Sequence, residues 1–340
     1  KYIGIRREKK YNEQTIAIAQ NLLTPAGVGV TALPWSGTLS GYIGAPYVQL
    51  GGGSGVGATA VALFDYTTGT VTGLVITSAG TGYNSAPTVT LKGGGKADNV
   101  LGAASVGPNT AGGLTKLGGG RLILTGISTY TGPTSIAAGI LDLAGAGRLG
   151  GGAYAAEITN SATLIIGTTA NQILSGVIGG AGSLVKTNSG TLTLTAVNAY
   201  SGATTVNGGA LDLAGAGLLG GGSYAAEITN NATLIVGTTA NQALSGTISG
   251  AGSLTKTNSG TLTLNAVNPY TGSTTVSGGT LVLGASSAIS NSATITVGAG
   301  AAFDVAAVPG GWTLVGGQTL QGFGAVPGDV PAAAGSRIVP

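Results

Sequence analysis

The sequence contains no cysteine, no histidine and no methionine, and only 7% of its 340 residues are charged. Without histidine, the chain lacks the commonest general base, the Ser-His-Asp triad and most zinc or iron sites. Without cysteine, it has no thiol nucleophile, no iron–sulfur ligand and no disulfide. Ten carboxylates remain for acid–base chemistry or calcium. Because so few reactive groups remain, we predict that the protein is not an enzyme, with no catalytic residues, no cofactor and no metal site.

The scarcity of charge also limits the fold class. Disordered chains combine low hydrophobicity with high charge, whereas 43% of this chain is hydrophobic. Glycine is abundant at 66 residues, but there are only 11 prolines and the glycines cluster, which excludes collagen. So much glycine, threonine and serine is also unfavourable for a helical bundle. A fold rich in β-structure remains.

Charge is unevenly distributed along the chain. Residues 1–13 carry a net charge of +3, while the eight basic and eight acidic residues that follow balance each other. A nucleic-acid partner would require a distributed basic face, so we expect no nucleic acid to bind. Every apolar run is interrupted before the roughly 18 to 20 residues that a membrane span requires. We therefore expect no membrane span.

Internal repetition is the most informative feature of the chain. The segment at 111–116 recurs, with substitutions, at 181–186 and 251–256, which is a spacing of 70 residues. Residues 141–210 and 211–280 are identical at 56 of 70 positions, and the third copy is nine residues shorter. Such a period indicates a repeat architecture.

Alternating residues within each repeat indicate strands. Thr191–Thr195 alternates polar and apolar residues, so a strand here would turn Leu192 and Leu194 inward. Glycine, asparagine and serine bound this run and several shorter ones. Roughly three coils of about 23 residues per repeat fit a parallel β-solenoid whose coils stack about 4.8 Å apart. An antiparallel sandwich or propeller is the alternative, although near-identical neighbours would tend to mispair in it.

The repeated motif also resembles a known family. Gly182–Thr195, followed by Ala199–Val206, combines a Leu-x-Lys start, a Gly-x-Leu-x-Leu strand and a Tyr-Ser-Gly-x-Thr turn, and the same order recurs at 112–141 and 252–281. These segments resemble the autotransporter-associated β-strand repeat, or passenger-associated transport repeat, and Gly317–Asp329 is similar to the segment that follows such repeats. The resemblance implies a secreted, right-handed β-helix at the bacterial surface. Members of the family act as passengers, adhesins or surface layers far more often than as enzymes.

We expect five segments along the chain. In order, these are an extended N-terminal assembly segment, a small glycine-rich β module, a connector, a β-solenoid and a C-terminal coil or cap: residues 1–50, 51–95, 96–110, 111–307 and 308–340. The solenoid would comprise three repeats, at 111–180, 181–250 and 251–307. The β module is similar to short modules of bacterial surface and phage fibre proteins. The N-terminal segment is too short to bury a core of its own.

Several residues resemble parts of functional sites. Gly53–Ala58 fits the loose G-x-G-x-x-A dinucleotide pattern, but a strand-like run follows it where a helix is required. The acids Asp142 and Asp212 recur, as do Glu157 and Glu227. Copies three coils apart would lie about 14 Å apart, whereas glycosidase carboxylates lie within roughly 10 Å of each other. We expect these acids to be solvated or to cap turns.

Other candidates recur once per repeat. We expect the repeated tyrosines to be corner residues instead of a sugar-stacking row, and the repeated lysines to face solvent: Tyr130, Tyr200, Tyr270, Lys116, Lys186 and Lys256. The Thr-x-Thr pattern at 191–195 could bind ice if it formed regular ranks on a flat face. Asn231 begins an N-glycosylation sequon that a bacterial product would usually leave unmodified.

The predicted function is structural. We expect a non-enzymatic, extracellular β-solenoid subunit that assembles head-to-tail into a bacterial surface filament or matrix. Part of residues 1–50 would pair with a neighbouring subunit by strand addition, and the alternative is that residues 15–50 cap their own solenoid. The second hypothesis is a monomeric autotransporter-type adhesin passenger that binds a surface glycan or host ligand. A polysaccharide-active β-helix enzyme or an ice-binding protein is the third.

Overall fold

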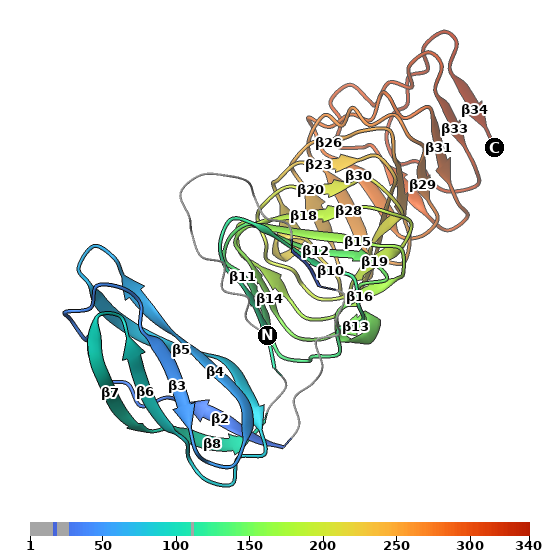
Figure 1. The fold of residues 1–340 in the computed structure, drawn as a ribbon. Coiled ribbons are helices and arrows are strands. Elements are labelled where there is room, and N and C mark those ends of the chain that lie inside the picture. Colours follow the sequence, from blue (N-terminus) through green and yellow to red (C-terminus); the bar gives the residue numbers. More distant parts are fainter. Residues whose placement is uncertain (1–15, 19–26, 110–111) are drawn as a thin grey trace. The chain divides into compact units, whose positions relative to one another are not determined.

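The computed structural model describes residues 16–18, 27–109 and 112–340. The described residues form two compact units, one of which lies within Thr24–Gly112 while the other comprises residues 16–18 and Gly113–Pro340. Strands dominate both units (Figure 1), which confirms the expected all-β class and the parallel β-solenoid. Among the residues described, no helix is long and apolar enough to cross a membrane.

The first unit is an antiparallel β module. Its main sheet has five strands in the order β5-β4-β3-β6-β7, and a second ladder joins β2 to β8. Alternating side chains of these strands point into a common core that includes Val48, Val71, Val89 and Leu91. The strands are β2 (Val28–Ala32), β3 (Tyr47–Gly51), β4 (Val56–Asp65), β5 (Thr70–Thr81), β6 (Thr88–Gly93), β7 (Lys96–Ala103) and β8 (Ser105–Pro108).

The module is larger than the sequence indicated. Residues 27–50, expected to belong to an extended assembly segment, supply β2 and β3, and residues 96–108, expected to form a connector, supply β7 and β8. Strand β3 lies at the centre of the sheet, between β4 and β6. The difference arises because the core needs strands from both ends of the segment, and such non-local antiparallel pairing leaves no periodic signal in the sequence.

The second unit is a solenoid whose chain visits three sheet faces in turn. Face one contains β1 (Ile16–Ile18), β10 (Arg121–Leu124), β12 (Ile140–Gly145), β15 (Thr163–Thr168), β18 (Ser183–Lys186), β20 (Thr204–Val206), β23 (Ile228–Asn230) and β26 (Ile248–Ser249). Face two contains β13 (Ala153–Tyr154), β16 (Gln172–Leu174), β19 (Thr191–Leu194), β21 (Ala210–Gly215), β24 (Thr233–Thr238), β27 (Ser253–Lys256), β29 (Thr274–Val276), β31 (Thr294–Val297), β33 (Thr319–Gln321) and β34 (Arg337–Val339).

Face three is built from two successive sheets. The first contains β9 (Leu114–Lys116), β11 (Thr134–Ile136), β14 (Ile158–Asn160) and β17 (Ile178–Gly179). The second contains β22 (Ser223–Tyr224), β25 (Gln242–Leu244), β28 (Thr261–Leu264), β30 (Thr280–Leu283) and β32 (Ala302–Asp304). One coil without a strand joins them, because Ala199 N donates to Ile178 O and Gly221 N donates to Asn198 O.

The 70-residue repeat does not contain a whole number of coils. Leu141 pairs with Leu164, which pairs with Leu184, so one coil takes about 21 residues. A repeat therefore makes about three and a third coils, and each copy begins one face further round the solenoid. Strand β12 lies on face one, whereas its equivalents β21 and β30 lie on faces two and three. The expected value of three coils of about 23 residues is corrected accordingly.

The solenoid interior is a continuous stack of aliphatic side chains. As predicted, Leu192 and Leu194 point inward, and both are fully buried. Leu192 pairs with Leu211, which pairs with Leu234, so like side chains lie directly above one another. Each fully buried leucine contributes about 1.5–3 kcal/mol. Glycine makes the corners, as at Gly209, where φ is +64° and a Cβ atom would lie 2.2 Å from Gly190 O.

A strand from the N-terminal segment belongs to the solenoid. Strand β1 pairs in parallel with β10, with Ile16 opposite Leu122 and Ile18 opposite Leu124. The β module is thus inserted in the chain between two solenoid strands, β1 and β9. The strands described within residues 1–50 pair with strands of their own chain. The predicted strand addition to a neighbouring subunit is therefore unsupported for them, while residues 1–15 and 19–26 lie outside the described part.

Candidate functional site

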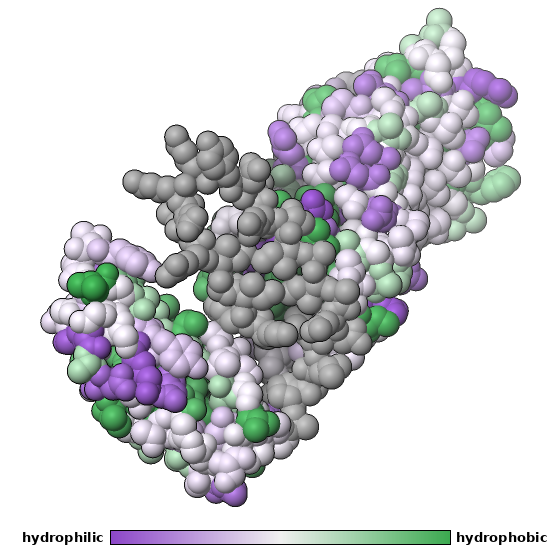
Figure 2. All heavy atoms as spheres, viewed as in Figure 1, coloured by the Kyte–Doolittle hydropathy of each residue, from purple (hydrophilic) through white to green (hydrophobic). Residues whose placement is uncertain are grey.

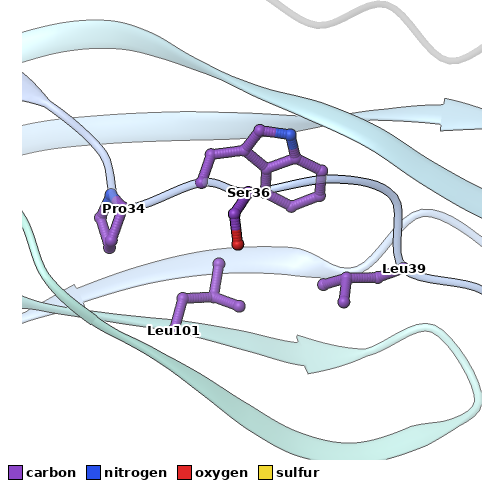
Figure 3. Close-up of a pocket in the computed structure, with 5 residues that line it drawn as sticks. Pro34, Ser36, Leu39 and Leu101 are labelled. Atoms are coloured by element: carbon purple, nitrogen blue, oxygen red, sulfur yellow. The ribbon is translucent and has the colours of Figure 1, made fainter.

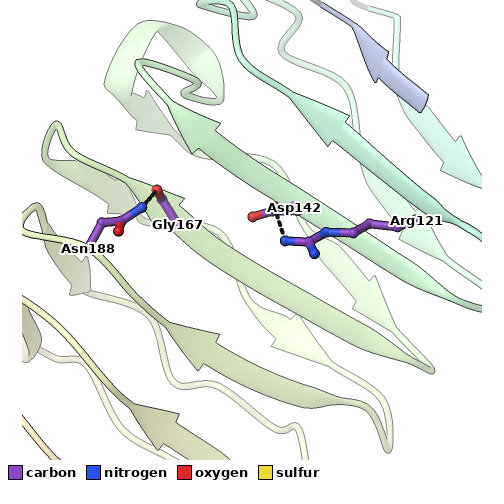
Figure 4. A network of polar contacts seen from close by, with 4 residues as sticks. All are labelled: Arg121, Asp142, Gly167 and Asn188. Atoms are coloured by element: carbon purple, nitrogen blue, oxygen red, sulfur yellow. Dashed lines mark hydrogen bonds and ion pairs between the residues drawn. The ribbon is translucent and has the colours of Figure 1, made fainter. Parts of the chain in front are cut away.

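The repeated aspartates occupy different environments. Asp142 on β12 is only 2% exposed, and its Oδ2 lies 2.5 Å from the guanidinium of Arg121 on β10 (Figure 4). Asp212 on β21 lies between Thr193 and Ile235 on the neighbouring strands, and burial raises the pKa of its carboxyl. The described residues include no group of three or more side chains that could hold a metal ion. The two aspartates lie on separate faces and do not form a pair.

The other carboxylate and glycine candidates also lie apart. Glu157 and Glu227 are exposed, each directly before a strand. Gly53–Ala58 forms the turn into β4, so no helix follows it. A Cβ atom at Gly55 would lie 2.3 Å from the ring of Tyr83, so packing against this ring requires the glycine. The dinucleotide interpretation therefore has no structural basis.

The repeated tyrosines are interior residues. Tyr200 is fully buried, and its ring meets that of Tyr224 edge to face with centroids 5.7 Å apart. The hydroxyl of Thr204 lies 2.7 Å from both tyrosine hydroxyls and joins them in one network. In the shortened third copy, Ser292 replaces the second tyrosine of this network. Because the rings are buried, they cannot form a sugar-stacking row on the surface.

The repeated lysines are buried, so the prediction that they face solvent is wrong. The Lys186 side chain is fully buried, and its Nζ donates to Thr187 O at 2.5 Å, Asn188 O at 2.9 Å and Gly208 O at 3.2 Å. Two of these carbonyls belong to its own coil and one to the next, so the ammonium joins consecutive coils. Lys256 makes the equivalent three bonds. Burial lowers the pKa of each of these two ammonium groups to about 8.

The threonine rank on face two is short, because Thr255, Thr275 and Thr296 lie in register on three successive strands but the rank does not continue along the sheet. In face two, Thr193 lies between Ile173 and Asp212 of the neighbouring strands. The equivalent Thr263 lies on β28 in face three, because each repeat begins one face further round. Ice binding requires a flat, regular array along a face, and the rank of face two is limited to three strands because Ile235 precedes it and Gln321 follows it.

Contiguous exposed apolar and polar side chains are found on the outer face of the β module. Tyr47 on the central strand β3 is 67% exposed and lies opposite Val61 on one side and Lys92 on the other. A second row follows Gln49, which lies opposite Thr90. We call this surface the Tyr47 face, and its residues are Tyr47, Gln49, Thr59, Val61, Thr77, Thr90 and Lys92.

The lysine of this face is paired with an aspartate of β7. Lys92 Nζ lies 3.1 Å from Asp98 Oδ2, and both side chains remain about half exposed. The hydroxyls of Thr59 and Thr77 lie 2.7 Å apart, which ties β4 to β5 at the outer surface. Figure 2 shows weakly polar residues over most of the visible surface of the described chain, with separate strongly hydrophilic groups on both units. The Tyr47 face therefore combines an aromatic ring, an amide and hydroxyls with no net charge.

A hollow lies on the opposite side of the module's sheet. It measures about 330 Å³ and is lined by Pro34, Trp35, Ser36, Leu39 and Leu101. The Ser36 hydroxyl points toward Leu101 among the surrounding apolar side chains (Figure 3). Because the hollow is open and apolar with a single hydroxyl, it has few groups to orient a polar ligand.

The sequence did not single out the residues of the Tyr47 face. Tyr47 and Gln49 fall in the segment expected to bind a neighbouring subunit. A signal was present, because Tyr47-Val48-Gln49-Leu50 alternates and so places tyrosine and glutamine on one side of a strand. This run was missed because it is only four residues long and follows a stretch rich in glycine and proline.

Comparison with known proteins identifies the repeats. The passenger-associated-transport-repeat family matches residues 114–143, 184–213 and 254–283, which confirms the resemblance found in the sequence. The chain is 32% identical over 321 residues to a protein of Brucella suis biovar 1 (strain 1330) named "Adhesin BmaC autotransporter". The match covers 77% of this chain but only 9% of that relative. No solved structure matches the chain.

Proposed function

We propose, from the passenger-associated transport repeats that this chain carries, that it is a non-enzymatic segment of an autotransporter-type adhesin at the bacterial surface. The solenoid acts as a rigid spacer, and the β module carries the surface that contacts a ligand. The repeat family, the adhesin relative and the β-solenoid fold support this proposal. The secreted, cell-surface location rests on the same family.

The observation that carries the proposal is how each unit exposes its large apolar side chains. In the module, Tyr47 and Val61 are both exposed and are direct partners in the sheet. In the described solenoid, the equivalent residues Val197 and Val267 lie in different coils and, because the repeat rotates, on different sides, and only Val177 lies one coil from Val197. Contiguous exposed apolar surface marks a site of interaction, whereas scattered residues do not.

The experiment removes the module and keeps the solenoid. Replacing Thr24–Gly112 by a flexible linker of about six residues leaves a coil of ordinary length between β1 and β10. We expect the shortened protein to keep its β-rich circular dichroism and its unfolding transition, but to bind host cells or extracellular matrix at least about tenfold more weakly than the full chain. Equal binding by both proteins would contradict the proposal.

The filament hypothesis has less support. It required unpaired strands in residues 1–50, and those that the structure describes pair within the chain. Head-to-tail assembly is therefore not part of the proposed function. Sedimentation of the purified chain over a range of concentrations checks this, with a monomer expected.

A further inference from the structure

The Tyr47 face presents its aromatic ring at the centre of a sheet. Strand β3 has two strands on either side, so the ring of Tyr47 stands about 10 Å from each sheet edge. Aromatic side chains exposed at such a position leave a large apolar area in water. Val61 extends this apolar area on one side, and the stem of Lys92 extends it on the other. The ring is therefore placed to stack against a ligand that crosses the strands.

Hydrogen-bonding groups run beside the apolar row. Gln49 lies two residues after Tyr47 on the same side of β3, and it is exposed. Thr90 lies opposite it on β6, Thr59 and Thr77 continue the row on β4 and β5, and the exposed Val100 ends it on β7. An amide offers two donors and an acceptor, and each hydroxyl offers both functions. The face can thus bind a ligand rich in hydroxyl groups.

The charge of the Tyr47 face limits which class of ligand it can bind. Lys92 and Asp98 form a pair, so the face offers no net positive charge to a nucleic acid or a sulfated or phosphorylated glycan. The exposed apolar groups are set in a sheet and interleaved with polar ones, which suits neither insertion into a membrane nor a dry protein interface. A ligand with alternating apolar C–H and hydroxyl surfaces and no charge matches all three features.

We propose that the Tyr47 face binds an uncharged polysaccharide chain, with a sugar ring stacked on Tyr47 and its hydroxyls bonded to Gln49 and Thr90. This inference rests on the proposed adhesin function and names the ligand of the same module. The sheet is about 19 Å wide across its five strands, so several consecutive sugar rings contact it. Binding of this kind depends little on salt, because no ion pair forms.

The experiment uses the full chain and a panel of immobilised glycans. The uncharged probes are mannan, galactan, β-1,3-glucan and cellulose, and the charged probes are heparin and alginate. The substitution Tyr47→Thr removes the ring and keeps a residue that favours strands. Tyr66→Thr is the matched control, because Tyr66 is 80% exposed but lies in the turn after β4, outside the Tyr47 face.

We expect the wild-type chain to bind at least one uncharged glycan, with affinity unchanged between 50 mM and 500 mM salt within about twofold. Tyr47→Thr should weaken binding at least about tenfold and Gln49→Ala about threefold to tenfold, while Tyr66→Thr stays within twofold. Failure of every uncharged glycan to bind, or equal loss in Tyr47→Thr and Tyr66→Thr, would overturn the inference. If the chain attaches to cells but to no uncharged glycan, the inference fails and the adhesin proposal stands. If it attaches to neither, both fail.

Discussion

The solenoid and the β module place the same residue types in opposite surroundings. Lys186, Tyr200 and Asp212 of the solenoid point into its interior or are largely covered by its coils. In the module, Tyr47 is exposed, and the paired Lys92 and Asp98 side chains are about half exposed. The solenoid buries its repeated lysines and tyrosines and uses them to join its coils, whereas the module presents the same residue types to solvent.

The difference follows from the way each unit repeats its backbone. Stacked coils place carbonyl groups at the same corner in every layer, so one buried ammonium meets several acceptors, as Lys186 does with Thr187 O and Gly208 O. A buried charge is tolerated only where such partners are fixed in place. The module has no repeated layers and therefore offers no comparable interior site. Its polar side chains remain outside, where they can meet a ligand.

The largest effect is expected from removing a buried ammonium. Lys186→Met keeps the length of the side chain but leaves three carbonyls of two coils without their donor. We expect the solenoid to lose at least about 3 kcal/mol of unfolding free energy. Lys96→Met in the module removes one hydrogen bond, from Nζ to Ser40 O, and the contact of Nζ with the Tyr42 ring, whose centroid lies 5.0 Å away. Because the Lys96 side chain is exposed, we expect a loss of only about 1 kcal/mol.

These two substitutions can be followed separately, because each unit contains one tryptophan, Trp35 or Trp312. Urea unfolding of Trp35→Phe and Trp312→Phe backgrounds reports on one unit at a time. Burial lowers the pKa of Lys186 to about 8, so between pH 8 and 10 the unfolded chain binds more protons than the folded one. Solenoid stability should therefore rise over this range, and less so in Lys186→Met. Equal losses from Lys186→Met and Lys96→Met would contradict the comparison.

A smaller effect is expected from the buried tyrosines at high pH. Burial raises the pKa of Tyr200 well above its usual value, so above about pH 10 the folded chain keeps a proton that the unfolded chain releases. Solenoid stability should then fall by about 1.4 kcal/mol per pH unit for each such tyrosine. Tyr200→Phe removes one titrating group and should reduce the slope by about one proton.

The control for this prediction is Tyr47→Phe in the module. Tyr47 lies in the other unit, so we expect the slope of solenoid stability against pH to stay unchanged. The measurement is urea unfolding at intervals between pH 10 and 11.5, followed by the fluorescence of one tryptophan at a time. If Tyr200→Phe leaves the slope unchanged, the hydroxyl of Tyr200 in the wild-type chain titrates alike in the folded and unfolded states, which would contradict the prediction.

Most of the solenoid could be predicted from sequence because it is built from local alternation. Thr191–Leu194 placed its leucines inward as expected. The same parity also placed Lys186 inward, two residues after the buried Leu184, but the usual preference of lysine for solvent concealed this signal. The number of coils per repeat was not predictable. Duplication determines the length of the sequence repeat, whereas the lengths of strands and corners determine how many residues one coil takes. The two need not match.

The module was less predictable because its pairings are non-local. Tyr47 lies opposite both Val61 and Lys92, and no local pattern identifies either partner. The candidate site depends on these pairings, because only they bring the tyrosine, the glutamine and the threonines onto one face. The absence of histidine and cysteine excluded many enzyme classes from sequence alone, but it could not indicate where a ligand would bind.

The smallest effect is expected at the aspartates. Their substitution should stabilise the solenoid but destabilise the module. Burial raises the pKa of Asp212, so at neutral pH its carboxylate is less favourable folded than unfolded, and stability falls as pH rises through its titration. Asp212→Asn should stabilise the solenoid by about 0.5 kcal/mol at pH 7 and have almost no effect at pH 2.5, where both states are protonated. Asp98→Asn in the module removes the exposed pair with Lys92 and should destabilise it by up to about 0.5 kcal/mol. Urea unfolding at both pH values measures each change, and a loss of stability in Asp212→Asn at pH 7 would show that the carboxylate has a favourable partner in the coil.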